Sequence, residues 1–112
     1  MTQIQLPHQR LIVYQRALQL LAAVKESGIR DHSTRDQAMR AARSVCLNIA
    51  EGASRWTKPD KRRAYVIARG EASEAAAAVE VAVQSGDAAP AAFPAVHCLA
   101  NEVVAMLTAM IR

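Results

Sequence analysis

The chain has 112 residues, of which 52% are hydrophobic but only 4% aromatic, and its formal net charge is +4. This length excludes two domains of ordinary size, since domains usually contain about 100–150 residues, and the composition excludes a core built on aromatic rings. We therefore expect residues 1–112 to form a single domain whose interior consists of Ala, Val, Leu, Ile and Met.

Apolar residues recur at helical spacing along almost the whole chain, and no segment has the sustained alternation of a strand. The first predicted helix begins at Pro7 or His8 and ends at Ser27. Gly28 follows it and suits the left-handed backbone position that ends many helices. The chain is therefore expected to be all-α.

The second predicted helix begins at Thr34, where the spacing Thr34-x-x-Gln37 lets each side chain accept the other residue's backbone N–H group. We expect this helix to end at Gly52. The third predicted helix begins at Thr57, whose hydroxyl can cap it, and runs to about Ser85.

The fourth predicted helix runs from about Phe93 to Ile111, because Pro90 and Pro94 cannot both lie inside an undisturbed helix. Four helices with short connections most simply form an antiparallel up-and-down bundle. An all-α four-helix bundle is therefore the expected fold class.

The third predicted helix is apolar on two sides. One stripe consists of Ile67, Ala78, Val81 and Ala82, and the other of Tyr65, Ala72, Ala76, Val79 and Val83. On the second helix, Leu47 and Glu51 lie together on the outer, mostly polar side. A helix that is apolar on two sides usually packs on two sides. We therefore expect the side of this helix that carries Tyr65 and Val83 to face another copy of the chain, which would also compensate for the small area that an Ala-rich core buries.

Polar residues next to these stripes raise a separate question. Asn48 lies at the edge of the apolar arc of the second helix, and Glu71 and Glu74 project near Ile67. An unpaired buried carboxylate is costly. Either these residues form a polar network with an Arg that fixes the register of the interface, or both carboxylates reach water. The sequence leaves both interpretations open.

Positive charge is concentrated in the first part of the chain. Residues 1–70 contain thirteen Lys or Arg and five Asp or Glu, a balance of +8, whereas residues 71–112 contain one and five, a balance of −4. Such a region attracts polyanions, although helical proteins also carry cations simply to solvate a face. The cations surround the turn between the second and third helices and extend beyond it: Arg40, Arg43, Arg55, Lys58, Lys61, Arg62, Arg63 and Arg69.

Cations at a helix entry can contact phosphate oxygens without reading bases, and Trp56 beside them can stack on an exposed base. The alternative is that Trp56 plugs the end of the bundle while the cations solvate it, and for Trp56 alone the plug is favoured. Salt-sensitive binding of RNA or DNA is the function that this cluster indicates best.

No catalytic apparatus is recognisable. His8, His32 and His97 are scattered without the spacing of metal ligands, and Ser44 lacks the context of a nucleophile. Cys46 and Cys98 form no CxxC pair and are expected to be structural thiols. We therefore expect no enzyme activity, no catalytic residues, no metal and no cofactor.

The location is expected to be cytoplasmic. No apolar run approaches the roughly 20 residues that span a bilayer, and MTQIQLPHQR lacks the apolar centre of a signal peptide. No membrane contact is expected on these grounds.

The segment SVCLNIAEGASR, residues 44–55, resembles the signature of the bacterial proteins encoded within intervening sequences of 23S ribosomal RNA genes. The resemblance extends upstream to VYQRALQL and downstream to ARGEASE, where Glu71 departs from the Ser usual in the family. It implies a four-helix bundle with Asn48 and Glu51 as interface groups and Gly52 at the end of a helix. It implies no particular biochemical activity.

That family is in turn similar to the accessory variability determinant of diversity-generating retroelements. This similarity implies a homopentameric ring whose positive surface binds nucleic acid or a reverse transcriptase. We therefore expect a non-enzymatic oligomeric bundle that binds RNA or DNA through phosphates. A scaffold for an acidic partner protein is the alternative, and a small hydrolase using Glu71 and Glu74 comes third.

Overall fold

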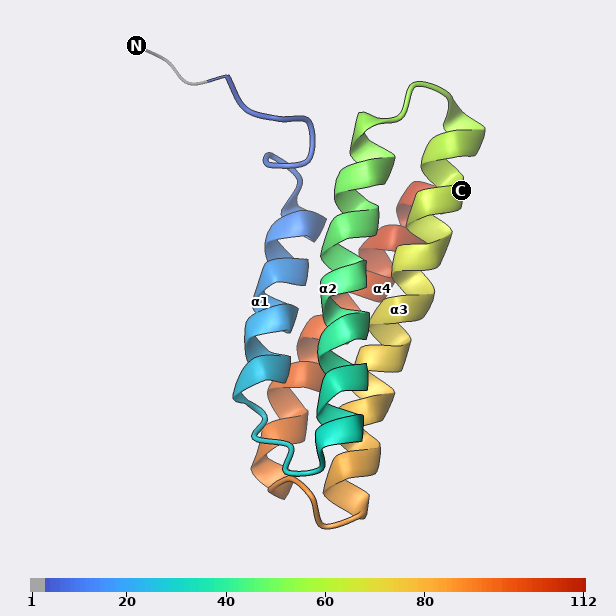
Figure 1. Ribbon diagram of the computed structural model, residues 1–112. Helices are drawn as coiled ribbons and strands as arrows, with labels where there is room; N and C mark the ends of the chain where they lie inside the picture. Colours follow the sequence, from blue (N-terminus) through green and yellow to red (C-terminus); the bar gives the residue numbers. More distant parts are fainter. Residues whose placement is uncertain (1–3) are drawn as a thin grey trace.

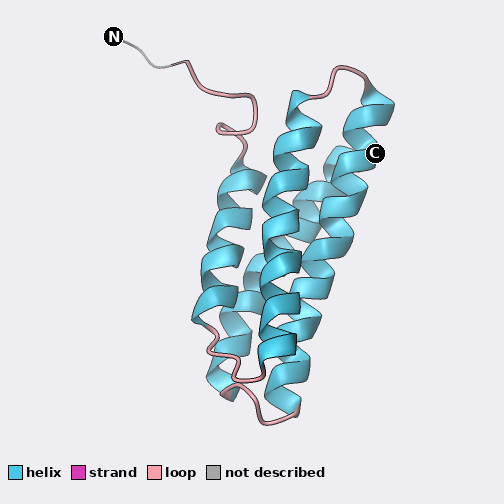
Figure 2. Cartoon of the chain, viewed as in Figure 1, coloured by secondary structure: helices cyan, strands magenta, loops and turns pink. Residues whose placement is uncertain are grey.

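The computed structural model describes residues 4–112 and consists of four α-helices and one short 3₁₀ turn. The helices are α1 (Ile12–Glu26), α2 (His32–Ser54), α3 (Lys58–Gln84) and α4 (Phe93–Ile111), and the turn η1 (Pro90–Ala92) precedes α4. Residues 4–112 contain no strand (Figure 2). The predicted all-α class with four helices is confirmed.

The helices surround one core. Helix α2 packs against α1 and α3, and α4 packs against the same two helices from the other side. Figure 1 places the α1–α2 and α3–α4 connections at one end of the bundle and the α2–α3 turn at the other. Residues 4–11 and the last turn of α4 lie toward the α2–α3 turn. We call this the basic end, because it carries Arg55, Lys58, Lys61, Arg62 and Arg63.

Two helix starts differ from the prediction. Helix α1 begins at Ile12, because the chain before it makes isolated turns, with the Leu11 N–H bonded to the His8 carbonyl at 3.1 Å. Helix α2 begins at His32, because Asp31 rather than Thr34 is its cap. The Asp31 carboxylate accepts the Thr34 backbone N–H at 2.9 Å, and this hydrogen bond lowers the pKa of Asp31.

The other boundaries agree with the sequence. Gly28 has a φ of 69° after α1, and the Thr57 side chain caps α3 by accepting the Asp60 N–H at 3.3 Å. Helix α4 begins at Phe93, with Pro94 in its first turn, where the missing N–H costs nothing.

Gly52 is an exception, because it lies inside α2 and does not end it. A Cβ atom at this position would be 2.5 Å from Cε1 of Tyr65. Gly52 therefore allows the Tyr65 ring of α3 to lie directly against the backbone of α2. Glycine serves here for close approach of two helices rather than for a left-handed turn.

Tyr65 belongs to the core of the single chain. It is 6% exposed, and burial raises the pKa of its hydroxyl. The expectation that its stripe faces another copy is wrong. Helix α3 does have a second apolar side, but Val66, Ile67 and Val81 form it, with Ile67 47% exposed.

The expectation that no apolar stretch is long enough to cross a bilayer is wrong for α4. Within the described residues, Pro90–Ile111 meets both criteria. Mostly buried core helices of soluble proteins pass the same test, but only 22% of the apolar window in α4 is buried, with Val96, Val103 and Leu107 between the neighbouring helices.

Both thiols are free, and they differ in burial. Cys46 is buried in α2, which raises the pKa of its thiol to about 11, whereas Cys98 is exposed on α4. At pH 8 we expect iodoacetamide to alkylate Cys98 readily and Cys46 only after denaturant is added, because the thiolate is the reacting form. Mass spectrometry counts the adducts, and equal labelling of both thiols in the folded chain would contradict this placement.

Candidate nucleic-acid interface

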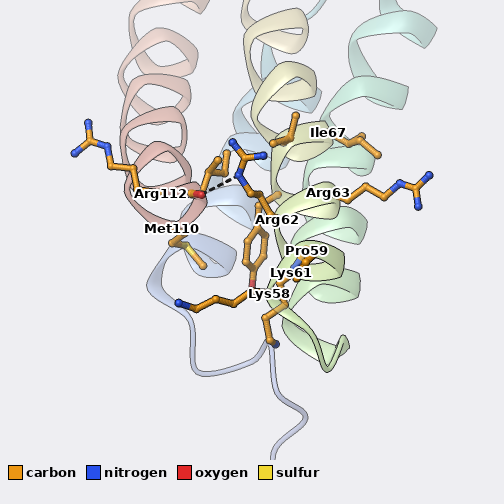
Figure 3. Close-up of a pocket in the computed structure, with 11 residues that line it drawn as sticks. Lys58, Pro59, Lys61, Arg62, Arg63, Ile67, Met110 and Arg112 are labelled. Carbon is orange, nitrogen blue, oxygen red and sulfur yellow. Dashed lines mark hydrogen bonds between the residues drawn. The ribbon is translucent and has the colours of Figure 1, made fainter.

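An open groove of about 980 Å³ lies at the basic end, between the first turns of α3 and the last turn of α4 (Figure 3). Its rim is cationic and its floor is apolar. The lining residues are Lys58, Pro59, Lys61, Arg62, Arg63, Tyr65, Val66, Ile67, Met110, Ile111 and Arg112. Four of the predicted phosphate-binding residues therefore meet at one groove.

Lys61 has a structural role at this end. Its Nζ donates to the carbonyl oxygens of Gly52 at 3.3 Å and Ala53 at 3.1 Å. These carbonyls lie in the last turn of α2, where helix carbonyls lack intrahelical partners and the helix dipole is negative. Lys61 thus stabilises the α2 terminus and is the least free of the predicted cations.

Arg62 and Arg69 connect α3 to α4. The Nε of Arg62 donates to the Ile111 carbonyl at 3.1 Å, and the Nε of Arg69 donates to the Thr108 hydroxyl at 2.7 Å. Figure 3 shows Arg62 reaching across the groove to make the first of these bonds. Both side chains are exposed, so their terminal nitrogens remain open to an anion.

Arg55 is paired with a carboxylate. Its Nη2 lies 2.6 Å from Oε1 of Glu51, one helical turn earlier. The hydrogen bond to Glu51 raises the pKa of Arg55, and roughly half of each side chain is exposed. Glu51 therefore offsets part of the positive charge at the basic end.

Lys58 and Arg63 are the freest of the predicted cations at the groove. Both are exposed, and neither has a hydrogen-bond or ion-pair partner within residues 4–112. Arg40 and Arg43 are equally free but lie on the outer face of α2. At about 1.5 Å per residue, Arg43 is about 18 Å from Arg55 along the helix axis. The eight predicted cations therefore form one cluster at the basic end, and Arg40 and Arg43 lie away from it.

Arg112 also lines the groove and was missed by the sequence-based reasoning. Its place depends on where the last turn of α4 lies relative to α3, which no local pattern indicates. The described part of the chain contains no group of three His, Cys, Asp or Glu that could hold a metal ion.

Trp56 does not plug the bundle. It is 97% exposed in the turn between α2 and α3. Tyr65 of α3, packed against Gly52, is instead a buried aromatic side chain near this end. The favoured interpretation of Trp56 is therefore wrong, and its indole faces solvent beside the cations.

Comparison with known families gives one match, to the 23S rRNA-intervening sequence protein family, over residues 9–109. This range covers most of the chain. The chain belongs to the 23S rRNA-intervening sequence protein family. A comparison with curated protein sequences gives no match.

In this member of the 23S rRNA-intervening sequence protein family, the polar residues of SVCLNIAEGASR make local contacts. Asn48 donates to the Ser44 carbonyl at 2.9 Å and to the Ser44 hydroxyl at 3.0 Å. Glu71 and Glu74 are half-buried, and neither has an ion-pair or hydrogen-bond partner in the described residues. Within residues 4–112 of a single copy, no network thus joins Asn48 to these carboxylates.

Leu47 extends the outer surface of this family member. It is 70% exposed on α2, on the same side of that helix as Arg40, Arg43 and Glu51. The exposed large apolar side chains of α2 and α3 are therefore Leu47, Val66, Ile67 and Val81.

Proposed function

We propose that this family member binds RNA or DNA at the basic end of the bundle, chiefly through phosphate oxygens. The observation that carries the proposal is the convergence of charge around the groove. Six cationic side chains line the groove and the smaller hollow next to it, compared with two acidic side chains, Glu51 and Asp60. Cations gathered at one end attract a polyanion more strongly than the same charges spread over the surface. The proposal assigns this end a binding role and no chemical step.

The family's name refers to 23S rRNA, which is compatible with a nucleic-acid-related role. The proposed setting is the cytoplasm, where thiols such as Cys46 and Cys98 stay reduced.

Self-association is part of the same proposal. The exposed residues Leu47, Val66, Ile67 and Val81 supply an apolar surface on α2 and α3 for a second copy. An up-and-down bundle repeated in a ring, as a homopentamer, would multiply a weak phosphate site. Light scattering of the pure protein gives the copy number, and a monomer at all concentrations would remove this part of the proposal.

The direct test measures fluorescence anisotropy of labelled, mixed-sequence RNA and DNA with the full chain. We expect micromolar or weaker binding per subunit at about 50 mM salt, with a large loss at about 200 mM. Absence of binding to every strand at low salt would refute the proposal.

An acidic partner protein is the second candidate, and the apolar floor of the groove favours it. Val66, Met110 and Ile111 lie between the cations, as a surface for an acidic amphipathic segment requires. Competition distinguishes the two candidates. Polyglutamate of matched charge should displace labelled RNA poorly if phosphate is the preferred ligand, and efficiently if the site is built for carboxylates.

Glu51→Gln is expected to raise the affinity for nucleic acid by about twofold to fivefold. The change removes a negative charge and releases Arg55 from an exposed ion pair. The same anisotropy titration at low salt measures the effect. Glu80→Gln is the matched control, because Glu80 is an exposed carboxylate in the last two turns of α3, remote from the groove. A gain of the same size in both variants would show that only net charge matters.

A further inference from the structure

Trp56 is the only tryptophan of the chain, and its indole packs against nothing in the described residues. It is 97% exposed, it is outside the hydrophobic core, and neither aromatic pair found in residues 4–112 includes it. Tryptophan is highly buried on average, because burying the indole is strongly favourable. A fully exposed indole therefore indicates a contact surface.

The turn that carries Trp56 is held on both sides. The Arg55 N–H donates to the Gly52 carbonyl at 3.3 Å, and the Lys61 N–H donates to the Thr57 carbonyl at 3.0 Å. The Lys61 ammonium also bonds to the end of α2. The backbone that carries the indole is thus held in place, and a ligand that stacks on it does not have to order the turn.

Charge surrounds the indole at short range. Arg55 is the residue before Trp56 and Lys58 is two residues after it, so their Cα atoms lie within about 8 Å of the Trp56 Cα atom, at about 3.8 Å per residue. Both side chains are exposed. An aromatic face between cations is the arrangement by which proteins hold unpaired nucleotides, with the base stacked and the phosphates paired. In a duplex, each base face is already covered by its neighbours.

We propose that the basic end prefers single-stranded nucleic acid, with an unpaired base stacked on Trp56 and the adjoining phosphates bound by Arg55 and Lys58. This inference rests on the proposed function and adds the class of strand. A membrane surface fits the turn less well, because Thr57, Lys58 and Asp60 follow Trp56 and no other large apolar side chain lies in the turn.

The intrinsic fluorescence of Trp56 reports the contact without a label. The full chain is titrated at low salt with oligouridine, with a duplex of equal length, and with an abasic phosphodiester strand of equal length. We expect oligouridine to quench the emission strongly and the other two ligands to leave it nearly unchanged. Equal quenching by all three would overturn the inference, because the abasic strand carries the charge but no base.

Variants give the second measurement, by anisotropy of the labelled strands. Trp56→Leu should lower the affinity for oligouridine by about fivefold to 150-fold and change the affinity for the duplex by less than about twofold. Trp56→Tyr should restore most of the loss, because it keeps an aromatic face. The fold is not at risk, since the side chain packs on nothing.

The outcomes separate this inference from the proposed function. If Trp56→Leu binds oligouridine as tightly as the parent chain, the stacking is refuted while phosphate binding stands. If the parent chain binds no strand, the proposed function falls and the inference falls with it. A blue shift of Trp56 emission on phosphatidylglycerol vesicles, without any response to strands, would assign the turn to a membrane surface and overturn both.

Discussion

Replacing Gly52 by alanine is expected to lower the free energy of unfolding by about 2 kcal/mol, although alanine is normally the better helix former. The new methyl group would lie 2.5 Å from Cε1 of Tyr65, a distance that non-bonded carbon atoms do not tolerate. Tyr65 is buried against the core, so its ring cannot move aside without displacing its neighbours. Urea denaturation followed by circular dichroism measures the change.

Gly70 provides the matched control. It also lies inside a helix, it is exposed, and a Cβ atom at this position would meet no atom within 4 Å. Gly70→Ala should therefore raise the free energy of unfolding by about 0.5–1 kcal/mol. In a Tyr65→Ala background, Gly52→Ala should cost much less, because the clash is gone. A Gly52→Ala chain as stable as Gly70→Ala would contradict the close approach of α2 and α3.

Reversing Lys58 and Arg63, two of the free cations of the groove, should have the largest effect on binding. Lys58→Glu/Arg63→Glu is expected to lower the affinity for RNA by about 100-fold at about 50 mM salt, because each lost phosphate contact costs roughly tenfold there. Neither side chain has a partner in the described residues, so the fold should persist. Anisotropy with labelled RNA gives the affinity, and circular dichroism verifies the helix content.

Lys25→Glu/Arg35→Glu makes the same change of charge at the other end of the bundle, where α1 ends and α2 begins. Screening limits the reach of exposed charges to about 10 Å at about 0.1 M salt, so this variant should lose less than about threefold. Arg40→Glu/Arg43→Glu, on the outer face of α2, should fall between the two. Equal losses in all three variants would mean that total charge, and not the basic end, determines binding.

The sequence predicted the elements well where local chemistry decides them. Gly28, the Thr57 hydroxyl, and Pro90 and Pro94 at the start of α4 act within their own short segment, so their positions are readable in a single chain. The capping of α2 was misassigned, because Asp31 and Thr34 both offer a suitable side chain and only the structure selects the first.

Other features depend on which helix faces which. Hydrophobic periodicity gives the angle between the two apolar stripes on α3, but it does not tell which stripe meets α2. The prediction therefore placed Tyr65 on the outside of the bundle and Ile67 on the inside, the reverse of what the structure has. In the same way, the sequence located the cations at the turn but did not reveal that Lys61 and Arg62 bond to carbonyls of α2 and α4. Such contacts join residues from different helices, and no local pattern encodes them.

The salt dependence of RNA affinity tests the central claim most directly. If the basic end binds through phosphates, the logarithm of the association constant should fall linearly with the logarithm of salt concentration, with a slope between about −2 and −4. Lys58→Ala/Arg63→Ala should make the slope less steep by about 1.4, because each phosphate contact to a single strand contributes about 0.7 to the slope. An affinity that does not change with salt, or no binding at low salt, would contradict the account.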